Sequence, residues 1–173
     1  TLANEFSRNG RRSGLTFAPE GGSERMRKVI NKMVSEEDLI RTVATAFSHG
    51  WRQVKLYFMC GLPTETDEDV LEIADLAKKV IAKGREVTGQ NDIRCTVSIG
   101  GFVPKPHTPF QWFGQNTTDE LRRKIQLVRN ASQRAKGVNV KWHDPAATLA
   151  EGIAARGDRR IGPVMERVWR DGG

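Results

Sequence analysis

The sequence has little cysteine and no long hydrophobic segment. Its two cysteines, Cys60 and Cys95, lie far apart in separate apolar runs, and their spacing is not that of a metal-ligand pair. We expect both to be buried thiols, because free cysteine behaves as a small hydrophobic residue. No apolar run approaches the roughly 20 residues of a membrane span. We therefore predict no metal ligands in this chain, no membrane partner and a cytoplasmic location.

The chain is also short for the fold that its pattern suggests. It has 173 residues, whereas a closed β/α barrel usually needs about 250. It starts at Thr1 with neither an initiator methionine nor a signal-peptide stretch, so we expect a piece of a longer protein.

Short apolar runs alternate with helical stripes, a pattern typical of repeated β-α units. We predict an α/β fold, a partial (β/α) barrel of three consecutive β-α units over residues 1–136. Residues 137–173 are expected to form a carboxyl-terminal extension with a short strand and helices. The predicted strands are residues 13–17, 53–60, 93–99 and 138–142. Helix caps are predicted at Ser23, Ser35, Thr66 and Thr117.

The first predicted strand leads into a glycine turn that carries a carboxylate. Gly21 and Gly22 would let the backbone approach a ligand or adopt positive φ, and Ser23 would begin a helix. Glu20 could accept hydrogen bonds from ligand hydroxyls. Two alternatives remain open, a tight turn with a capping residue and a phosphate cradle of an ordinary β/α barrel.

The second strand carries a lysine in its interior. Lys55 and Tyr57 share one face of this strand, and an interior lysine is unusual unless that face lines a polar cavity. Both are candidate cofactor or substrate contacts. Gly61 and Pro63 in the following loop are either part of the binding site or a turn before a helix cap.

The third strand ends in a loop rich in proline and aromatic residues. Phe102, Val103 and Pro104 open this loop, which continues through His107 to Trp112. It is either a rigid lid over a flat ring or a rigid connector that covers the end of the barrel.

The net charge of +7 allows a nucleic-acid partner or a well-solvated surface. Arg8, Arg11 and Arg12 form the densest basic cluster, and Trp112 and Trp142 could stack on bases. The alternative function is therefore a basic nucleic-acid-binding module without catalysis.

In these motifs the chain resembles the radical S-adenosylmethionine (SAM) superfamily. The resemblance rests on residues 16–25 with 29–32, on residues 61–66, and on residues 102–110. Residues 141–145 and 157–160 resemble a subgroup of uncharacterised radical-SAM proteins that also carry a cobalamin-binding-type domain. The resemblance to the superfamily implies that the chain supplies the second half of a radical-SAM (β/α)6 barrel.

The resemblance also implies cofactors and roles. The parent protein would use SAM and a 4Fe-4S cluster to make a 5′-deoxyadenosyl radical, and cobalamin use is left open. Glu20 would contact the SAM ribose, Gly61 to Pro63 would shape the pocket, and Phe102 to Pro104 would lie near the adenine. The substrate is not implied, although some relatives modify RNA.

The chain departs from the family pattern in two respects that bear on its own activity. It contains neither the Cys-x-x-x-Cys-x-x-Cys ligand motif nor a Gly-Gly-Glu motif for the SAM amino group. Iron–sulfur clusters need several thiolates, so we expect the isolated chain to be inactive. Its expected partners are the missing amino-terminal half of the barrel and, through open sheet edges, a second copy of itself.

Overall fold

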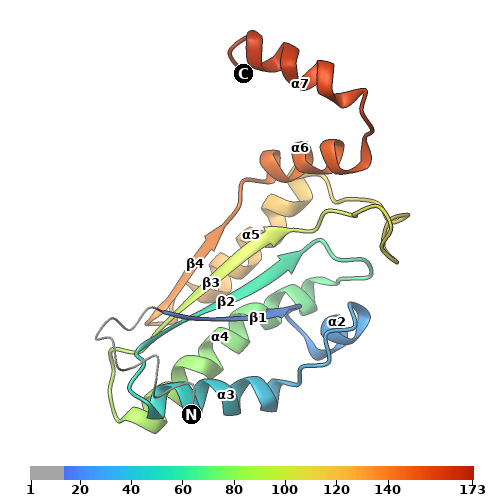
Figure 1. Cartoon of the computed structure of the whole chain (residues 1–173). Coiled ribbons are helices and arrows are strands. Elements are labelled where there is room, and N and C mark those ends of the chain that lie inside the picture. The colour runs from blue at the N-terminus through green and yellow to red at the C-terminus, as the bar shows by residue number, and fades with distance from the viewer. Residues whose placement is uncertain (1–13) are drawn as a thin grey trace.

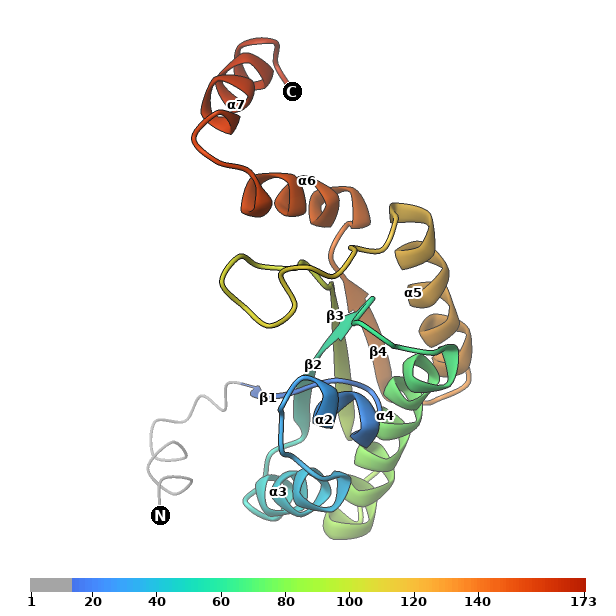
Figure 2. The ribbon, with the colours of Figure 1, turned by 90° about the vertical axis from the view of Figure 1, so that its right-hand side faces the viewer.

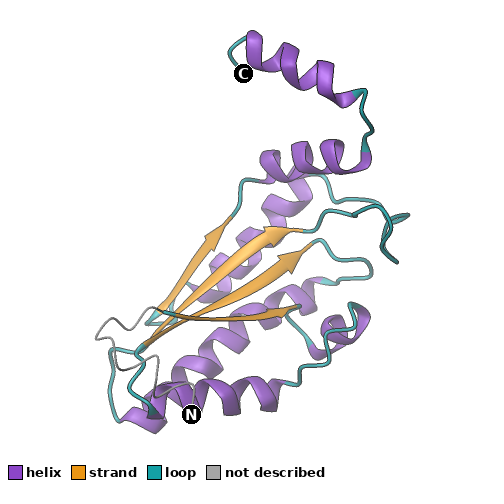
Figure 3. Ribbon diagram, in the orientation of Figure 1, coloured by secondary structure: helices purple, strands orange, loops and turns teal. Residues whose placement is uncertain are grey.

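The computed structural model describes residues 14–173 and shows one parallel sheet with helices between its strands (Figure 1). The sheet has four strands in the order β1-β2-β3-β4. They are β1 (Leu15–Glu20), β2 (Gln53–Cys60), β3 (Arg94–Gly101) and β4 (Val138–Trp142). The helices of the described residues are α2 (Glu24–Val29), α3 (Glu36–Ser48), α4 (Asp67–Thr88), α5 (Thr118–Ser132), α6 (Pro145–Arg156) and α7 (Ile161–Arg170) (Figure 3).

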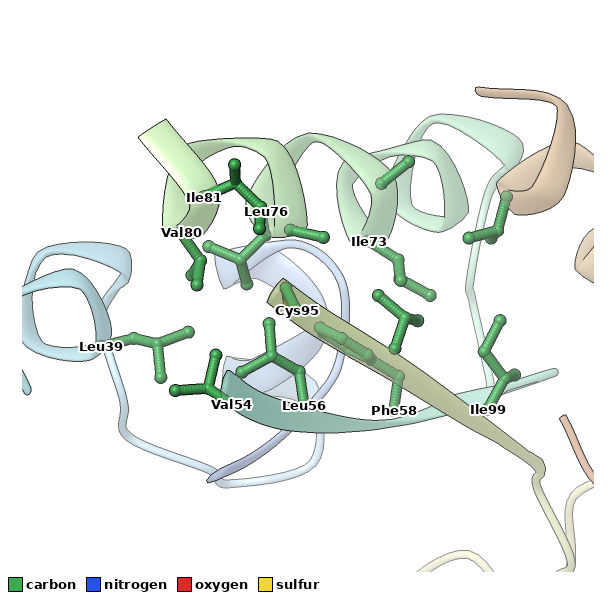
Figure 4. Packing of buried hydrophobic residues seen from close by; sticks show 14 of the residues in the cluster. Leu39, Val54, Leu56, Phe58, Ile73, Leu76, Val80, Ile81, Cys95 and Ile99 are labelled. Atoms are coloured by element: carbon green, nitrogen blue, oxygen red, sulfur yellow. The ribbon is translucent and has the colours of Figure 1, made fainter. Parts of the chain in front are cut away.

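The helices α3, α4 and α5 cover one face of this sheet, and the core lies between them and the strands (Figure 2). Alternate residues of β2 and β3 point into this layer because side chains of a strand alternate between its two faces. In Figure 4 the long helix α4 lies across them with Ile73, Leu76, Val80 and Ile81. The strand residues of this core include Val54, Leu56, Phe58, Cys95, Val97 and Ile99.

No helix in the described part of the chain covers the opposite face (Figure 2). We call this surface the open face. The strand residues on it are less buried in β2, where Lys55, Tyr57 and Met59 are only partly covered. In a closed barrel the corresponding face lines the interior, so the arrangement is consistent with a partial β/α barrel of the radical-SAM type.

The predicted α/β fold class is confirmed. The strands β2 and β4 have the predicted bounds. All four predicted caps are present, and Thr66 forms a complete capping box with Asp69. Capping satisfies backbone N–H groups that the first helical turn leaves without partners.

Other predicted bounds were wrong by a few residues. The first strand continues through Pro19 to Glu20 rather than ending at Phe17, with a register shift against β2 between Phe17 and Glu20. The following helix, which begins after the predicted cap at Ser23, is short: α2 ends at Val29, and Met33 beyond it is 76% exposed. Asn31 explains the early end, because its φ of 57° is left-handed and cannot continue a right-handed helix.

The carboxyl-terminal segment starts inside the sheet. β4 pairs in parallel with β3, and α6 packs against α5 and β3. α7 buries none of its residues (Figure 1). The division of the chain at residue 137 stays a prediction, and the cluster of Arg8, Arg11 and Arg12 lies outside the described residues. No described helix is both long and apolar enough to span a membrane.

Candidate active site

The predicted site residues that follow the strands meet at one edge of the sheet. Parallel strands end on the same side, so the segments after β1, β2 and β3 are neighbours. Each contributes one buried residue to a separate apolar cluster, namely Met26, Leu62 and Phe102. We call these three segments, residues 20–26, 61–66 and 102–113, the rim.

Glu20 lies at the end of β1 in an unusual backbone conformation. Its φ is 70°, and the next amide, Gly21 N, donates to Pro19 O at 2.9 Å. A positive φ is uncommon for a residue with a side chain and costs free energy. The Glu20 carboxylate is partly exposed and has no hydrogen-bond or ion-pair partner among the described residues. Its role as a ligand contact stays a prediction.

The buried arginine Arg27 holds the glycine turn from below. It is 1% exposed, and its Nη1 donates to Gly21 O at 3.1 Å and to Gly22 O at 2.9 Å. Its Nε donates to Val34 O at 2.8 Å. Burial lowers the pKa of this guanidinium. These bonds fix the turn that carries Glu20.

Gly22 and Ser23 attach the same turn to the start of α4. A Cβ on Gly22 would lie 2.2 Å from Asp69 O and 2.8 Å from Ile73 Cγ1, so only glycine fits. Ser23 Oγ donates to Asp69 Oδ1 at 2.6 Å and accepts from Met26 N at 3.0 Å. The turn is thus a close packing contact between helices, with the predicted cap at Ser23.

Asp69 is an ion-pair centre that the sequence did not reveal as part of the site. Arg25 Nε donates to it at 3.2 Å, and Thr66 N donates to Asp69 Oδ2 at 2.8 Å. Burial opposes its ionisation, but the hydrogen bonds from Arg25 and Ser23 outweigh burial and hold the pKa of Asp69 well below its usual range. This carboxylate makes the Ser23 helix start a poor place for a phosphate.

The second rim segment is held by a buried ion pair. Gly61 has a φ of 86°, and its N–H donates to Glu65 Oε2 at 2.7 Å. Lys124 Nζ from α5 reaches the same oxygen at 2.8 Å, with side chains that are 1% (Glu65) and 6% (Lys124) exposed. Burial raises the pKa of Glu65 despite this partner. Pro63 lies buried in the same segment.

The third rim segment contributes aromatic packing. Phe102, Val103 and Pro104 are buried, and Phe102 N donates to Cys60 O at 2.8 Å. The Phe110 ring meets the Phe102 ring edge to face at 6.0 Å. Figure 2 shows this loop reaching out on the open-face side of the sheet. This position is compatible with both interpretations of the loop, a lid and a connector.

Lys55 and Tyr57 form a pair on the open face. Lys55 Nζ donates to Tyr57 Oη at 2.9 Å and lies 4.3 Å from the ring centroid. The hydrogen bond and the charge of Lys55, together with the nearby hydroxyl group of Ser98 on β3, lower the pKa of Tyr57. Neither residue belongs to the apolar rim cluster, and their role as cofactor or substrate contacts stays a prediction.

The neighbours of Lys55 and Tyr57 were not predicted from the sequence. Register places Thr96 opposite Lys55, and Ser98 between Tyr57 and Lys141. His143 follows β4, with its Nδ1 3.9 Å from the position that a Cβ on Gly100 would take. Alternation within each strand was a signal for the face, but only the strand register brings these residues together.

The cysteines of the chain do not form a metal site. Both are buried and free, as predicted, and burial raises the pKa of the Cys95 thiol to about 12 and that of Cys60 still further. Within residues 14–173 no group of three or more His, Cys, Asp or Glu side chains could hold a metal ion.

Comparison with known proteins agrees with the geometry. Residues 2–77 match the family model of the Radical SAM superfamily. The matched segment contains β1, the glycine turn and β2, and it supports a relation to this enzyme family over the first part of the chain. The match reaches the first two rim segments and stops inside α4, before the third.

A second similarity extends over almost the whole chain. An uncharacterized protein of Methanocaldococcus jannaschii is 34% identical over 166 residues, which cover 96% of this chain. The chain spans only 35% of the length of that relative. Neither comparison shows a cobalamin-binding domain, a substrate or the role of any single residue.

Proposed function

We propose that this chain is part of a radical-SAM enzyme and forms the ribose and adenine side of its SAM site. The observation that carries the proposal is the carboxylate of Glu20 at the end of β1, which has no partner within residues 14–173 and lies inside the segment that matches the superfamily. Carboxylates accept strong hydrogen bonds, and the two hydroxyls of a ribose are donors that fit one. Gly61 to Pro63 and Phe102 to Pro104 flank this position at the rim.

The residues of this chain suit SAM but do not suit the 4Fe-4S cluster. The rim offers an acceptor without a partner in the described part of the chain, the buried aromatic ring of Phe102 and a fixed turn, which suit a nucleoside. The 4Fe-4S cluster of the family does not fit, because the two cysteines are buried core residues with raised pKa values. The thiolate ligands of a cluster would have to come from residues outside this chain. When bound there, the cluster supplies the electron that cleaves SAM.

Substitution of Glu20 tests the proposal. In the full-length protein, Glu20→Gln keeps the shape of the side chain but removes the charge that strengthens ribose hydrogen bonds. We expect SAM to bind about tenfold to a hundredfold more weakly, because a hydrogen bond to a charged group contributes about 1.5–3 kcal/mol. Calorimetric titration with SAM measures the affinity.

Glu86→Gln is the matched control, since it removes the same charge from an exposed residue near the far end of α4. It should leave SAM affinity unchanged. Equal affinities for the Glu20 variant and the unmodified protein would reject the assignment of the ribose contact.

The nucleic-acid module remains the second candidate function. Trp112 is 84% exposed and available for stacking, whereas the Arg129 guanidinium already lies 4.7 Å from the centroid of the Trp142 ring. Phosphate-dominated binding weakens steeply with salt. Titration of a single-stranded RNA at two salt concentrations separates the candidates, because SAM binding through Glu20 should depend much less on salt.

Two further parts of the proposal concern the parent protein. The missing half of a barrel would pair with β1, the edge strand of the described sheet, and a cobalamin-binding-type domain would lie elsewhere in the longer chain. We also propose a cytoplasmic location.

A further inference from the structure

The open face of the sheet is polar and basic, in contrast to the apolar helix-covered face. Register aligns Tyr57, Ser98 and Lys141 in one row across β2, β3 and β4. Lys55, Thr96 and Asn139 form the adjacent row. These rows place amino and hydroxyl groups side by side, since aligned residues of neighbouring strands share a face.

This face carries positive charge without a matching negative charge. On β2, β3 and β4 its charged residues are Lys55, Arg94 and Lys141, and none of its positions on these strands is an aspartate or glutamate. The carboxylates nearest in sequence to Arg94 and Lys141 are Asp92 and Asp144, which lie outside the strands. An isolated cation on a partly covered surface gains free energy from an anionic partner.

Lys55 shows this lack of a partner most clearly. It is partly buried, and its only hydrogen-bond partner among the described residues is the phenolic oxygen of Tyr57. The buried hydroxyl group of Ser98 approaches the same phenol. A lysine held against a neutral hydroxyl retains two further N–H donors for a ligand.

We infer that the open face binds an oxyanion of the substrate, a phosphate or a carboxylate. Lys55 and Lys141 supply the positive charge, and the Tyr57 and Ser98 hydroxyls supply hydrogen bonds. Describing the ligand as the substrate rests on the proposed function, whereas the anion site itself rests on these residues alone. The open face therefore selects anionic substrates, which the rim residues do not.

Tyr57 provides a direct probe because it is the one tyrosine of the chain. Its phenolate absorbs at a longer wavelength than the phenol, so an alkaline spectrophotometric titration reports the ionisation of this residue. Binding of an anion beside the phenol disfavours the phenolate and raises its pKa. Inorganic phosphate and acetate are the two probes, and sodium chloride at matched ionic strength accounts for screening.

We expect phosphate or acetate to raise the pKa of Tyr57 saturably and beyond the effect of chloride. A stronger response to phosphate identifies a phosphate-bearing substrate, and a stronger response to acetate identifies a carboxylate. Lys141→Gln should leave the pKa in the absence of anion nearly unchanged but weaken anion binding by about tenfold or more. Lys55→Met should raise the starting pKa and abolish the response.

Lys78→Gln is the control, because Lys78 is an exposed residue of α4 that pairs with Asp75. A response no larger than that of chloride would overturn the inference, as would unaltered anion binding in folded Lys141→Gln protein. The titration does not involve SAM. Failure of the Glu20 test therefore leaves this result intact, and the two proposals can fail separately.

Discussion

The Ser23 hydroxyl donates a 2.6 Å hydrogen bond to the Asp69 carboxylate across 46 positions of sequence. It joins the turn after β1 to the first turn of α4, and both groups are buried. The Asp69 carboxylate also accepts a hydrogen bond from Arg25 and completes the capping box of Thr66. One carboxylate thus holds two helix starts and the segment that carries Glu20.

Asp69→Asn should destabilise the fold. The amide keeps the size of the side chain but loses the charge that Arg25 and Ser23 stabilise, so we expect the free energy of unfolding to fall by about 2–3 kcal/mol. Urea denaturation near neutral pH measures the change. Asp75→Asn removes an exposed pair with Lys78 and should cost no more than about 0.5 kcal/mol.

The loss of stability in Asp69→Asn should become smaller in acid. The pKa of Asp69 is lower in the folded than in the unfolded chain, so its stabilisation is fully present above the ordinary value of about 3.9. It decreases as the pH falls below that value toward the folded pKa. The difference between the original protein and Asp69→Asn should therefore shrink from about pH 5 to about pH 3. A constant difference would contradict the role of the charge.

Gly22→Ala should be destabilising because of contact with α4. The new methyl group would lie 2.2 Å from the backbone oxygen of Asp69, and backbone cannot move aside as a flexible side chain can. We expect a loss of about 2 kcal/mol or more in the free energy of unfolding. Gly114→Ala has open space and should be nearly neutral. Equal effects of the two substitutions would refute the packing argument.

Lys124→Met should leave Glu65 buried without its cation. Breaking one side of such a pair costs about 3–5 kcal/mol. The double variant Glu65→Gln/Lys124→Met should recover part of this loss, since no charge then remains. Thermal or urea unfolding of the three proteins measures the effect, and a double variant less stable than Lys124→Met would contradict it.

The loss in Lys124→Met should also depend on pH. Burial raises the pKa of Glu65, so folding favours its protonated form, and the removal of Lys124 raises that pKa further. A raised folded pKa means that stability is lost as the pH rises through it. The variant should therefore regain stability relative to the original protein as the pH falls from about 7 to about 5.

The isolated chain should associate through its strand edges. β1 and β4 each have one strand partner in the described sheet, and unpaired strand edges invite pairing with another chain. Light scattering over a range of concentrations should show a rising average mass. Trp169→Lys removes an exposed apolar side chain from α7, and association should persist in it if the edges are responsible. A monomer at every concentration would contradict the prediction.

The sequence predicted elements whose signals are local. The alternation of β2 placed Leu56 and Lys55 on opposite faces, and the cap residues marked the beginnings of the helices. The end of α2 was missed because it depends on the left-handed backbone of Asn31. Asparagine tolerates this conformation but does not require it, so the residue type alone does not predict a helix end.

The site was less predictable because it depends on contacts between distant segments. Asp69 could be predicted as the acidic member of a capping box, but not as the partner of Ser23. Lys55 and Tyr57 could be predicted to share a face, whereas their proximity to Ser98 and Lys141 follows from the pairing of three strands. Sequence spacing contains no information on that register.

The apolar cluster of Met26, Leu62 and Phe102 limits how this site can evolve or be engineered. Because one residue from each rim segment fills the same apolar cluster, the three loops cannot be exchanged independently. A larger residue at any of these positions must displace the other two, and with them the turn that carries Glu20. New specificity should arise more readily on the open face, where single side chains can change without moving the backbone.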